Sequence, residues 1–115
     1  MQIVIPDNQG CDRQVIEFLG SLDSVQCIEA LERMEIYERF SVLEAIQKHK
    51  LEKLEDNLYE LRVPIANIKL RFFGVLQGST LTLVYVFSKK SKRIPSNELR
   101  AAKRKASTFL LNTSS

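Results

Sequence analysis

The chain has few of the residues that build metal centres or redox sites. Its 115 residues include one histidine, two cysteines and no tryptophan. Cys11 and Cys27 are not spaced as a CxxC pair, so we interpret them as reduced thiols. A tetrahedral zinc site needs four ligands, which this sequence does not supply, so we expect neither metal nor cofactor. His49 lies in a charged KHK segment and is interpreted as a surface residue.

Long hydrophobic runs are also missing. The longest apolar run, Leu81 to Phe87 interrupted by Thr82, is far shorter than the ~20 residues of a membrane-spanning helix. The amino terminus shows no basic region followed by an apolar stretch, as a secretory signal would. With 44% hydrophobic and 27% charged residues, the composition is that of a folded domain. We therefore expect a cytoplasmic protein with a single domain over residues 1–115.

Charge is divided unevenly along the chain, although the net charge is only +3. Residues 1–61 contain 6 basic and 13 acidic side chains, whereas residues 62–115 contain 11 basic and 1 acidic. A basic surface concentrates anions around it, so this half favours a polyanionic partner such as nucleic acid. The charge does not show whether the protein modifies that partner.

Apolar spacing predicts helices in the first half of the chain. Residues three and four apart are apolar from Gln14 to Gly20, from Asp23 to Met34 and from Val42 to Gln47. The first two helices are expected to form a helical hairpin. The charged segment KHKLEKLEDN that follows is interpreted as a connection ending in a turn at Asp56-Asn57.

A period of two predicts strands in the second half. We expect strands in residues 58–63, 68–75 and 81–87, with the last in the centre, and a short strand at Gln2 to Ile5. Pro95 is expected to open a carboxy-terminal helix with Leu99, Ala102, Ala106 and Phe109 on its inner side. The predicted fold is α+β: a small, curved antiparallel sheet with the helices on one face and the other face partly open.

The strand pattern brings basic residues together on the polar face of the sheet. Arg62 and Arg71 fall on this face in adjacent strands, with Lys69 two residues away and the KKSKR cluster at the edge. The two arginines fit a phosphate clamp, because each guanidinium offers a fixed fork of donors. The alternative is a pair of exposed arginines bonded to acids such as Glu60. Tyr85 and Phe87 share one face, where they stack on a base or, more commonly, belong to the core.

The order of these motifs resembles a known family. NLYELRV, then KLRFF, then LTLVYVFSKKSKRIPSNELRAAKRK resembles the phage-derived, HigB-type branch of the RelE toxin superfamily. VIEFLGSLDS also resembles the first helix of that branch, so the similarity extends over residues 2 to 109. The RelE-like fold implied is the α+β arrangement described above.

The resemblance implies the toxin of a type II toxin-antitoxin system. Such a toxin is a metal-independent endoribonuclease that cleaves messenger RNA on the ribosome, and a helix-turn-helix, HigA-like antitoxin neutralises it. The catalytic positions implied, taking Tyr85 where the family often has histidine, are Arg62, Arg71, Tyr85, Lys89 and Lys90. The residues expected to contact messenger or ribosomal RNA are Lys69, Phe87, Lys92, Arg93, Arg100, Lys103 and Arg104. The alternative is a non-catalytic RNA- or protein-binding module on the same fold, because histidine is better suited to proton transfer than tyrosine.

Overall fold

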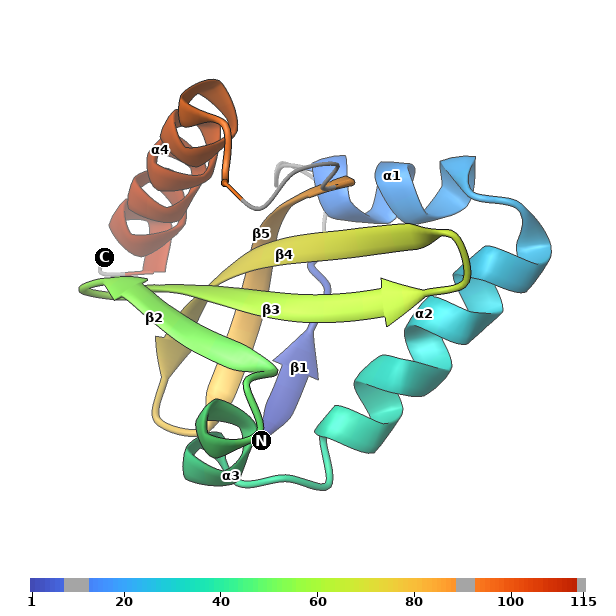
Figure 1. Ribbon diagram of the computed structural model, residues 1–115. Coiled ribbons are helices and arrows are strands. Elements are labelled where there is room, and N and C mark those ends of the chain that lie inside the picture. Colours follow the sequence, from blue (N-terminus) through green and yellow to red (C-terminus); the bar gives the residue numbers. More distant parts are fainter. Residues whose placement is uncertain (8–12, 89–92, 114–115) are drawn as a thin grey trace.

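The computed structural model describes residues 1–7, 13–88 and 93–113 (Figure 1). Helices and strands follow the chain in the order β1 (Gln2–Val4), α1 (Gln14–Ser21), α2 (Ser24–Tyr37), α3 (Val42–Gln47), β2 (Leu51–Glu55), β3 (Leu58–Ile65), β4 (Ile68–Gln77), β5 (Thr80–Ser88) and α4 (Ser96–Thr113). The α+β class predicted from the sequence is confirmed. Among the described residues, no helix is both long and apolar enough to cross a membrane.

The strands form a five-stranded mixed sheet in the order β1-β5-β4-β3-β2. From β2 to β5 each strand runs antiparallel to its neighbour, as predicted, but β1 runs parallel to β5. Gln2 begins this parallel pair and donates its backbone N–H to the carbonyl of Ser79 at 2.8 Å. The expectation of a purely antiparallel sheet with β5 at its centre was therefore wrong. With β1 on its outer side, β5 is an interior strand, and β4 lies in the middle.

Strand β2 was not predicted, because its sequence LEKLE does not alternate as a strand does. Leu51 and Leu54 contribute one apolar side chain to each face of the sheet, and the residues between and after them are charged. Charged side chains are common on edge strands, where they discourage pairing with another chain. The expected turn at Asp56-Asn57 is present, and Asn57 adopts the left-handed conformation with φ of 67°.

The helices begin where their capping residues allow. Asp23 and Ser41 accept hydrogen bonds from the backbone N–H of Gln26 and Glu44, closing a capping box at the start of α2 and α3.

The predicted hairpin of α1 and α2 is matched only in part. The two helices are consecutive, but α1 packs on β5 and α2 packs on β3. Each helix buries its apolar side on the sheet, because the sheet offers a larger apolar surface than the other helix.

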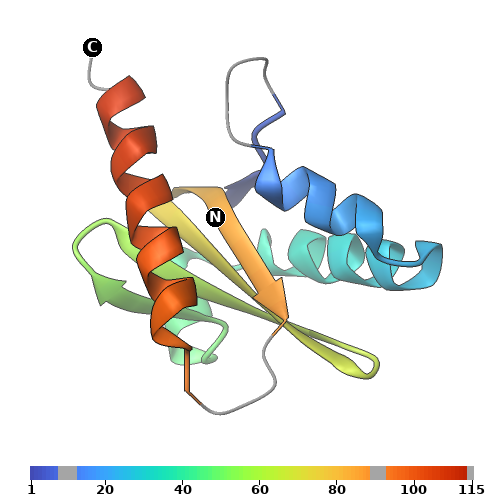
Figure 2. The same ribbon diagram turned by 90° about the horizontal axis from the view of Figure 1, so that it is seen from above.

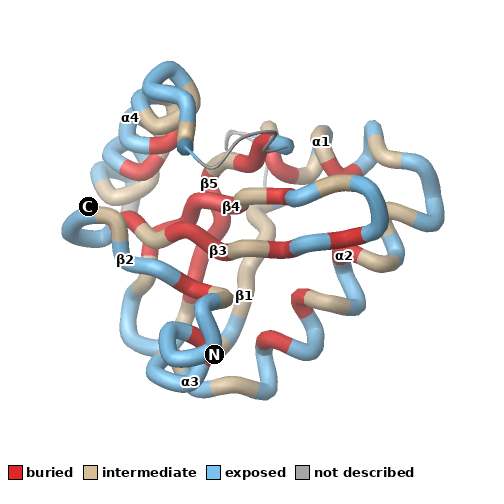
Figure 3. The backbone as a smooth tube through the Cα atoms, in the orientation of Figure 1, coloured by how far each residue is buried: buried red, intermediate tan, exposed pale blue. Residues whose placement is uncertain are grey.

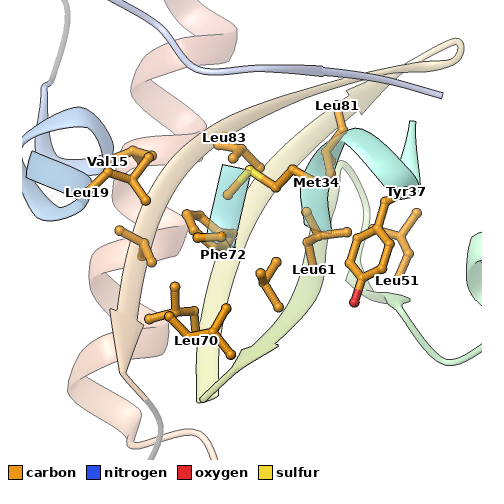
Figure 4. Packing of buried hydrophobic residues seen from close by; sticks show 14 of the residues in the cluster. Val15, Leu19, Met34, Tyr37, Leu51, Leu61, Leu70, Phe72, Leu81 and Leu83 are labelled. Carbon is orange, nitrogen blue, oxygen red and sulfur yellow. The ribbon is translucent and has the colours of Figure 1, made fainter. Parts of the chain in front are cut away.

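Side chains pack on both faces of the sheet. Helices α1, α2 and α3 cover one face, the α1–α3 face, where Leu61, Phe72 and Leu83 are fully buried or nearly so (Figure 4). Helix α4 covers part of the other face, the α4 face (Figure 2). Its Ala102 and Ala106 pack in one buried cluster with sheet residues. The expectation that all helices share one face is therefore wrong. The inner side of α4 is as predicted, and the helix leaves the end of this face toward the β3–β4 turn uncovered (Figure 2).

A β-bulge in β5 determines which aromatic side chains reach the α4 face. Phe73 pairs with Tyr85 and Gly74 pairs with Leu83, so Val84 is an extra residue between them. As a result Leu83 faces the α1–α3 side while both Val84 and Tyr85 face α4. A Cβ atom on Gly74 would lie 2.8 Å from Leu81 Cδ1 and 2.9 Å from the carbonyl oxygen of Thr82. Glycine is therefore required where the two strands approach at the bulge.

Candidate functional site

Two arginines lie side by side on the open part of the α4 face. Arg62 on β3 and Arg71 on β4 are direct partners in the antiparallel register. Opposite residues in such a pair have Cβ atoms roughly 5 Å apart. The pairing that the sequence predicted is therefore present. Helix α4 packs on the same face over Phe73 and Val75, which leaves the arginines on the side toward the β3–β4 turn.

A buried carboxylate lies between the two arginines. Glu60 is only 1% exposed, and its Oε1 lies 3.1 Å from Arg62 Nη2. Its Oε2 lies 3.7 Å from Arg71 Nε, which is longer than a hydrogen bond. Burying a carboxylate is costly unless a positive charge compensates it, and here both arginines do so. The sequence offered ion pairing with acids such as Glu60 as the alternative to a phosphate clamp. That pairing is present in this site.

Arg62 is held by several acceptors. Its Nη2 also lies 3.1 Å from Glu52 Oε2, across the β2–β3 pair. Its Nη1 donates a hydrogen bond to the backbone carbonyl of His49 at 3.2 Å. The guanidinium is consequently fixed in orientation, and much of its hydrogen-bonding capacity is used within the protein. In the described part of the chain, Arg62 therefore acts first as a structural tie between β2, β3 and the turn before β2.

Arg71 has a different environment. Its side chain is only 12% exposed, yet its guanidinium forms no hydrogen bond with any described residue, and its Nε is fully buried. Burial lowers the pKa of Arg71 from its ordinary value, Glu60 opposes that shift, and Arg62 adds to it. The group stays protonated near neutral pH because an arginine pKa is so high. A buried cation with unused donors is suited to receive an anion such as a phosphate oxygen.

The aromatic residues beside the arginines are directed toward α4. Phe87 is the direct partner of Arg71 across β4 and β5, but it is only 9% exposed and stacks on Phe73 at 5.7 Å between ring centroids. The Tyr85 hydroxyl donates a hydrogen bond to Glu98 Oε2 at 3.0 Å. Burial raises the pKa of Tyr85, and the hydrogen bond with Glu98 raises it further. Both side chains therefore lie in the contact between sheet and helix.

The other predicted RNA-binding residues are distributed around this face. Lys69, Arg93, Arg100 and Arg104 are exposed, and Lys103 lies 3.1 Å from Glu55 in an ion pair at the β2 end. Lys89, Lys90 and Lys92 lie outside the described residues. Lys69 is two residue pairs beyond Arg71, on the same face of the sheet and toward the β3–β4 turn. Lys69 therefore lies with the arginine pair. The exposed basic residues Arg100 and Arg104 lie along α4.

Glu52 and His49 were not connected with this site from the sequence. After α3, Lys48 and His49 form a tight turn in which His49 has φ of 59°. The chain then enters β2, which pairs antiparallel with β3. The His49 main chain is thereby close to Arg62, although the residues are distant in sequence. The sequence could have connected Glu52 with this site only if β2 had been recognised as a strand, because the β2–β3 register pairs Glu52 with Glu60. Within residues 1–7, 13–88 and 93–113, no group of three His, Cys, Asp or Glu side chains is placed to hold a metal ion.

Comparison with known proteins identifies the family of this chain. A search of curated proteins found no match. The family model described as phage derived protein Gp49-like (DUF891) matches residues 17–107, which is most of the chain. The match begins within α1, ends within α4, and includes Glu60, Arg62 and Arg71. The protein therefore belongs to the phage-derived Gp49-like family, a RelE-like family associated with toxin–antitoxin systems.

Proposed function

We propose that this protein is the toxin of a type II toxin–antitoxin system and that it belongs to the HigB-type branch. Its proposed activity is ribosome-dependent cleavage of messenger RNA. Family membership supports the toxin class, and the motif order NLYELRV, KLRFF and LTLVYVF supports the branch. The observation that carries the proposed activity is Arg71, a nearly buried arginine with unused donors on a part of the sheet that helix α4 does not cover.

Strand scission requires attack by a ribose 2′-oxygen on the neighbouring phosphorus. The bond from phosphorus to the 5′-oxygen then breaks, and the departing 5′-oxygen takes up a proton while the 2′-hydroxyl loses one. Negative charge on the phosphate oxygens increases in the transition state, so fixed cations accelerate the reaction. In our proposal Arg71 donates to a phosphate oxygen. Arg62, whose guanidinium is held in place by Glu60 and Glu52, is the second cation beside that phosphate. Lys89 and Lys90 are proposed to reach the same phosphate.

RNA docking in this proposal extends beyond the reacting phosphate. Lys69, Lys92 and Arg93 contact the messenger, while Arg100, Lys103 and Arg104 on α4 contact ribosomal RNA. Phe87 and Tyr85 contribute by shaping the floor of the site, because their side chains are held between β5 and α4. The proposed protein partner is a HigA-like antitoxin with a helix-turn-helix domain.

The test is induced expression in a bacterium, with growth and messenger cleavage as readouts. Wild-type protein should arrest growth and yield messenger fragments by primer extension, and in a purified mixture it should cut messenger only when ribosomes are added. Arg71→Ala should lose both effects, with a loss of cleavage rate of about a hundredfold or more. Arg39→Ala is the matched control, because Arg39 is exposed at the end of α2 and should leave arrest unchanged. A toxic Arg71→Ala variant would overturn the proposed role of this residue.

A second candidate function is RNA binding without cleavage. It is favoured by Tyr85, which replaces the family's frequent histidine and whose hydroxyl is already engaged by Glu98. Its raised pKa makes it a poor general base near neutral pH. This alternative predicts salt-sensitive RNA binding with no cut messenger, so ribosome-dependent fragments would exclude it.

A further inference from the structure

Helix α2 carries an unexpected row of exposed apolar side chains. Val25, Ile28, Leu31 and Ile36 are between 44% and 72% exposed. Val25 and Ile36 are eleven residues apart, about three helical turns, and Ile28 and Leu31 continue along the same side. Isolated exposed apolar residues are ordinary on a protein surface, but a row on one side of one helix marks an interaction surface.

These side chains are only partly covered by the fold. The opposite side of α2 supplies Ala30, Met34 and Tyr37 to the core on the α1–α3 face. The Tyr37 hydroxyl also donates to the backbone carbonyl of Arg62 at 2.9 Å, which fixes the helix on β3. Helix α2 is therefore apolar on two sides, and Figure 3 shows its buried and exposed residues alternating along the helix.

Two acidic residues lie within the same row. Glu32 and Glu35 are exposed, and neither forms an ion pair or hydrogen bond with a residue in the described ranges. Glu32 is four residues after Ile28 and Glu35 four residues after Leu31, which places them on the same side of the helix. We name Val25, Ile28, Leu31, Glu32, Glu35 and Ile36 the α2 stripe.

We propose that the α2 stripe is a docking surface for a protein helix that is apolar on one side and flanked by lysine or arginine. The apolar side chains supply area to bury, and the free carboxylates select positive charge at its border. Nucleic acid is a poor occupant because both glutamates repel phosphate. A second copy is also disfavoured, since two α2 stripes facing each other would bring like charges together.

The position of the α2 stripe separates this surface from the arginine pair. The buried side of α2 lies on the α1–α3 face of β3, whereas Arg62 and Arg71 lie on the α4 face. The stripe points outward from the opposite side of the molecule, away from the sheet. A partner helix bound there leaves the arginine face accessible. This surface goes beyond the proposed RNA chemistry and does not depend on it.

The test uses the full chain and two synthetic helical peptides of 18 residues. Both peptides have leucine at the same helical positions, and the remaining positions are lysine in one and glutamate in the other. Fluorescence anisotropy should show the lysine peptide binding at least about tenfold more tightly than the glutamate peptide. Ile28→Ser should weaken binding of the lysine peptide by about tenfold, because a buried apolar contact is lost. The double change Glu32→Gln and Glu35→Gln should weaken it by about threefold or more.

Leu111→Ser is the matched control, because Leu111 is also an exposed apolar residue but lies near the end of α4. It should leave peptide binding unchanged, and circular dichroism should show that every variant is folded. Equal binding of the two peptides, no binding, or no effect of Ile28→Ser would overturn the proposal. Sedimentation of the wild-type chain alone tests the other occupant. Self-association that Ile28→Ser abolishes would assign the α2 stripe to a second copy and also overturn the proposal.

Discussion

At the scale of single residues, Glu60 determines what the arginine pair can do. Two guanidinium groups in direct register on one face repel each other, and a buried carboxylate between them offsets that repulsion. Glu60 contacts Arg62 at 3.1 Å but Arg71 only at 3.7 Å. The compensation is therefore stronger for Arg62, and Arg71 is the better placed of the two to bind an external anion.

The burial of Glu60 predicts a large effect on stability. Glu60→Gln removes the charge but keeps the size, so Arg62 and Arg71 lose their shared counter-charge in a partly buried site. We expect the free energy of unfolding to fall by about 2–3 kcal/mol, measured by urea denaturation. Glu52→Gln is the control and should cost less than about 1 kcal/mol, because Glu52 is half exposed. Equal losses in the two variants would show that burial of Glu60 is not the cause.

Tyr85 predicts a pH dependence of stability. Its folded-state pKa is raised above the ordinary value of about 10, so its neutral hydroxyl stabilises the fold below that pH. The contribution is lost as pH rises through the folded pKa. Tyr85→Phe should therefore lower the free energy of unfolding by about 1 kcal/mol at pH 7 and lessen the decline above about pH 10. Denaturation in urea between pH 7 and 11 measures both effects, and an unchanged alkaline decline would contradict the assignment.

At the scale of elements, the bulge in β5 decides which side chains enter each core. Without the bulge, regular alternation after Leu83 would place Val84 on the α4 face and Tyr85 on the α1–α3 face instead of beneath α4. Its hydrogen bond to Glu98 at the start of α4 depends on this local change of direction. The bulge therefore links the sheet to the helix that borders the arginine site.

Two glycines provide a matched test of this element. Gly74→Ala would bring a Cβ atom to 2.8 Å from Leu81 Cδ1 and 2.9 Å from a Thr82 backbone oxygen, so the strands must shift. We expect a loss of about 1–3 kcal/mol in the free energy of unfolding. Gly20 lies in α1 with no atom within 4 Å of an added Cβ, so Gly20→Ala should instead stabilise by about 0.5–1 kcal/mol. Thermal or urea unfolding of the two variants should give opposite signs; a stabilising Gly74→Ala would show that the bulge relaxes freely.

At the scale of the whole molecule, the division of charge along the chain corresponds to a division in space. The acidic first half contributes α1 and α2 on one side of the sheet, and the basic second half contributes the arginine strands and α4 (Figure 2). In our proposals RNA contacts the basic side and a cationic helix contacts the α2 stripe.

The basic side predicts a strong dependence of RNA binding on salt. Affinity for a short single-stranded RNA should fall linearly on a logarithmic scale as salt concentration rises, because phosphate contacts release counterions. Arg71→Ala should reduce the magnitude of that slope by about 0.7, the value for one contact on a single strand. Anisotropy titrations with labelled RNA at several salt concentrations measure the slope, with Arg39→Ala as the control. An unchanged slope in Arg71→Ala would show that Arg71 does not contact phosphate.

Local sequence patterns determined most of the helices and strands of this protein. In the described part of the chain, the spacing of apolar residues predicted the four helices and the strands β3, β4 and β5, because helix and strand periods act within a few residues. The β-prone residues Gln2 to Ile5 predicted β1. The same alternation placed Arg62 and Arg71 on one face. It also gave Glu60 as an example of a salt-bridge partner, in the alternative to a phosphate clamp, since residues 60 and 62 of a strand point to the same side.

How those helices and strands are arranged in space was decided only by the tertiary structure. The position of β1 beside β5, the edge strand β2 and the packing of α4 on the opposite face depend on contacts between distant residues. The burial of Glu60 and the His49 carbonyl bond to Arg62 follow from that assembly, so neither was visible in the local pattern. The sequence by itself determined which residues carry positive charge on the sheet. Packing decided that Arg62 is already bonded within the protein and that Arg71 retains free donors, because long-range contacts set burial and partners.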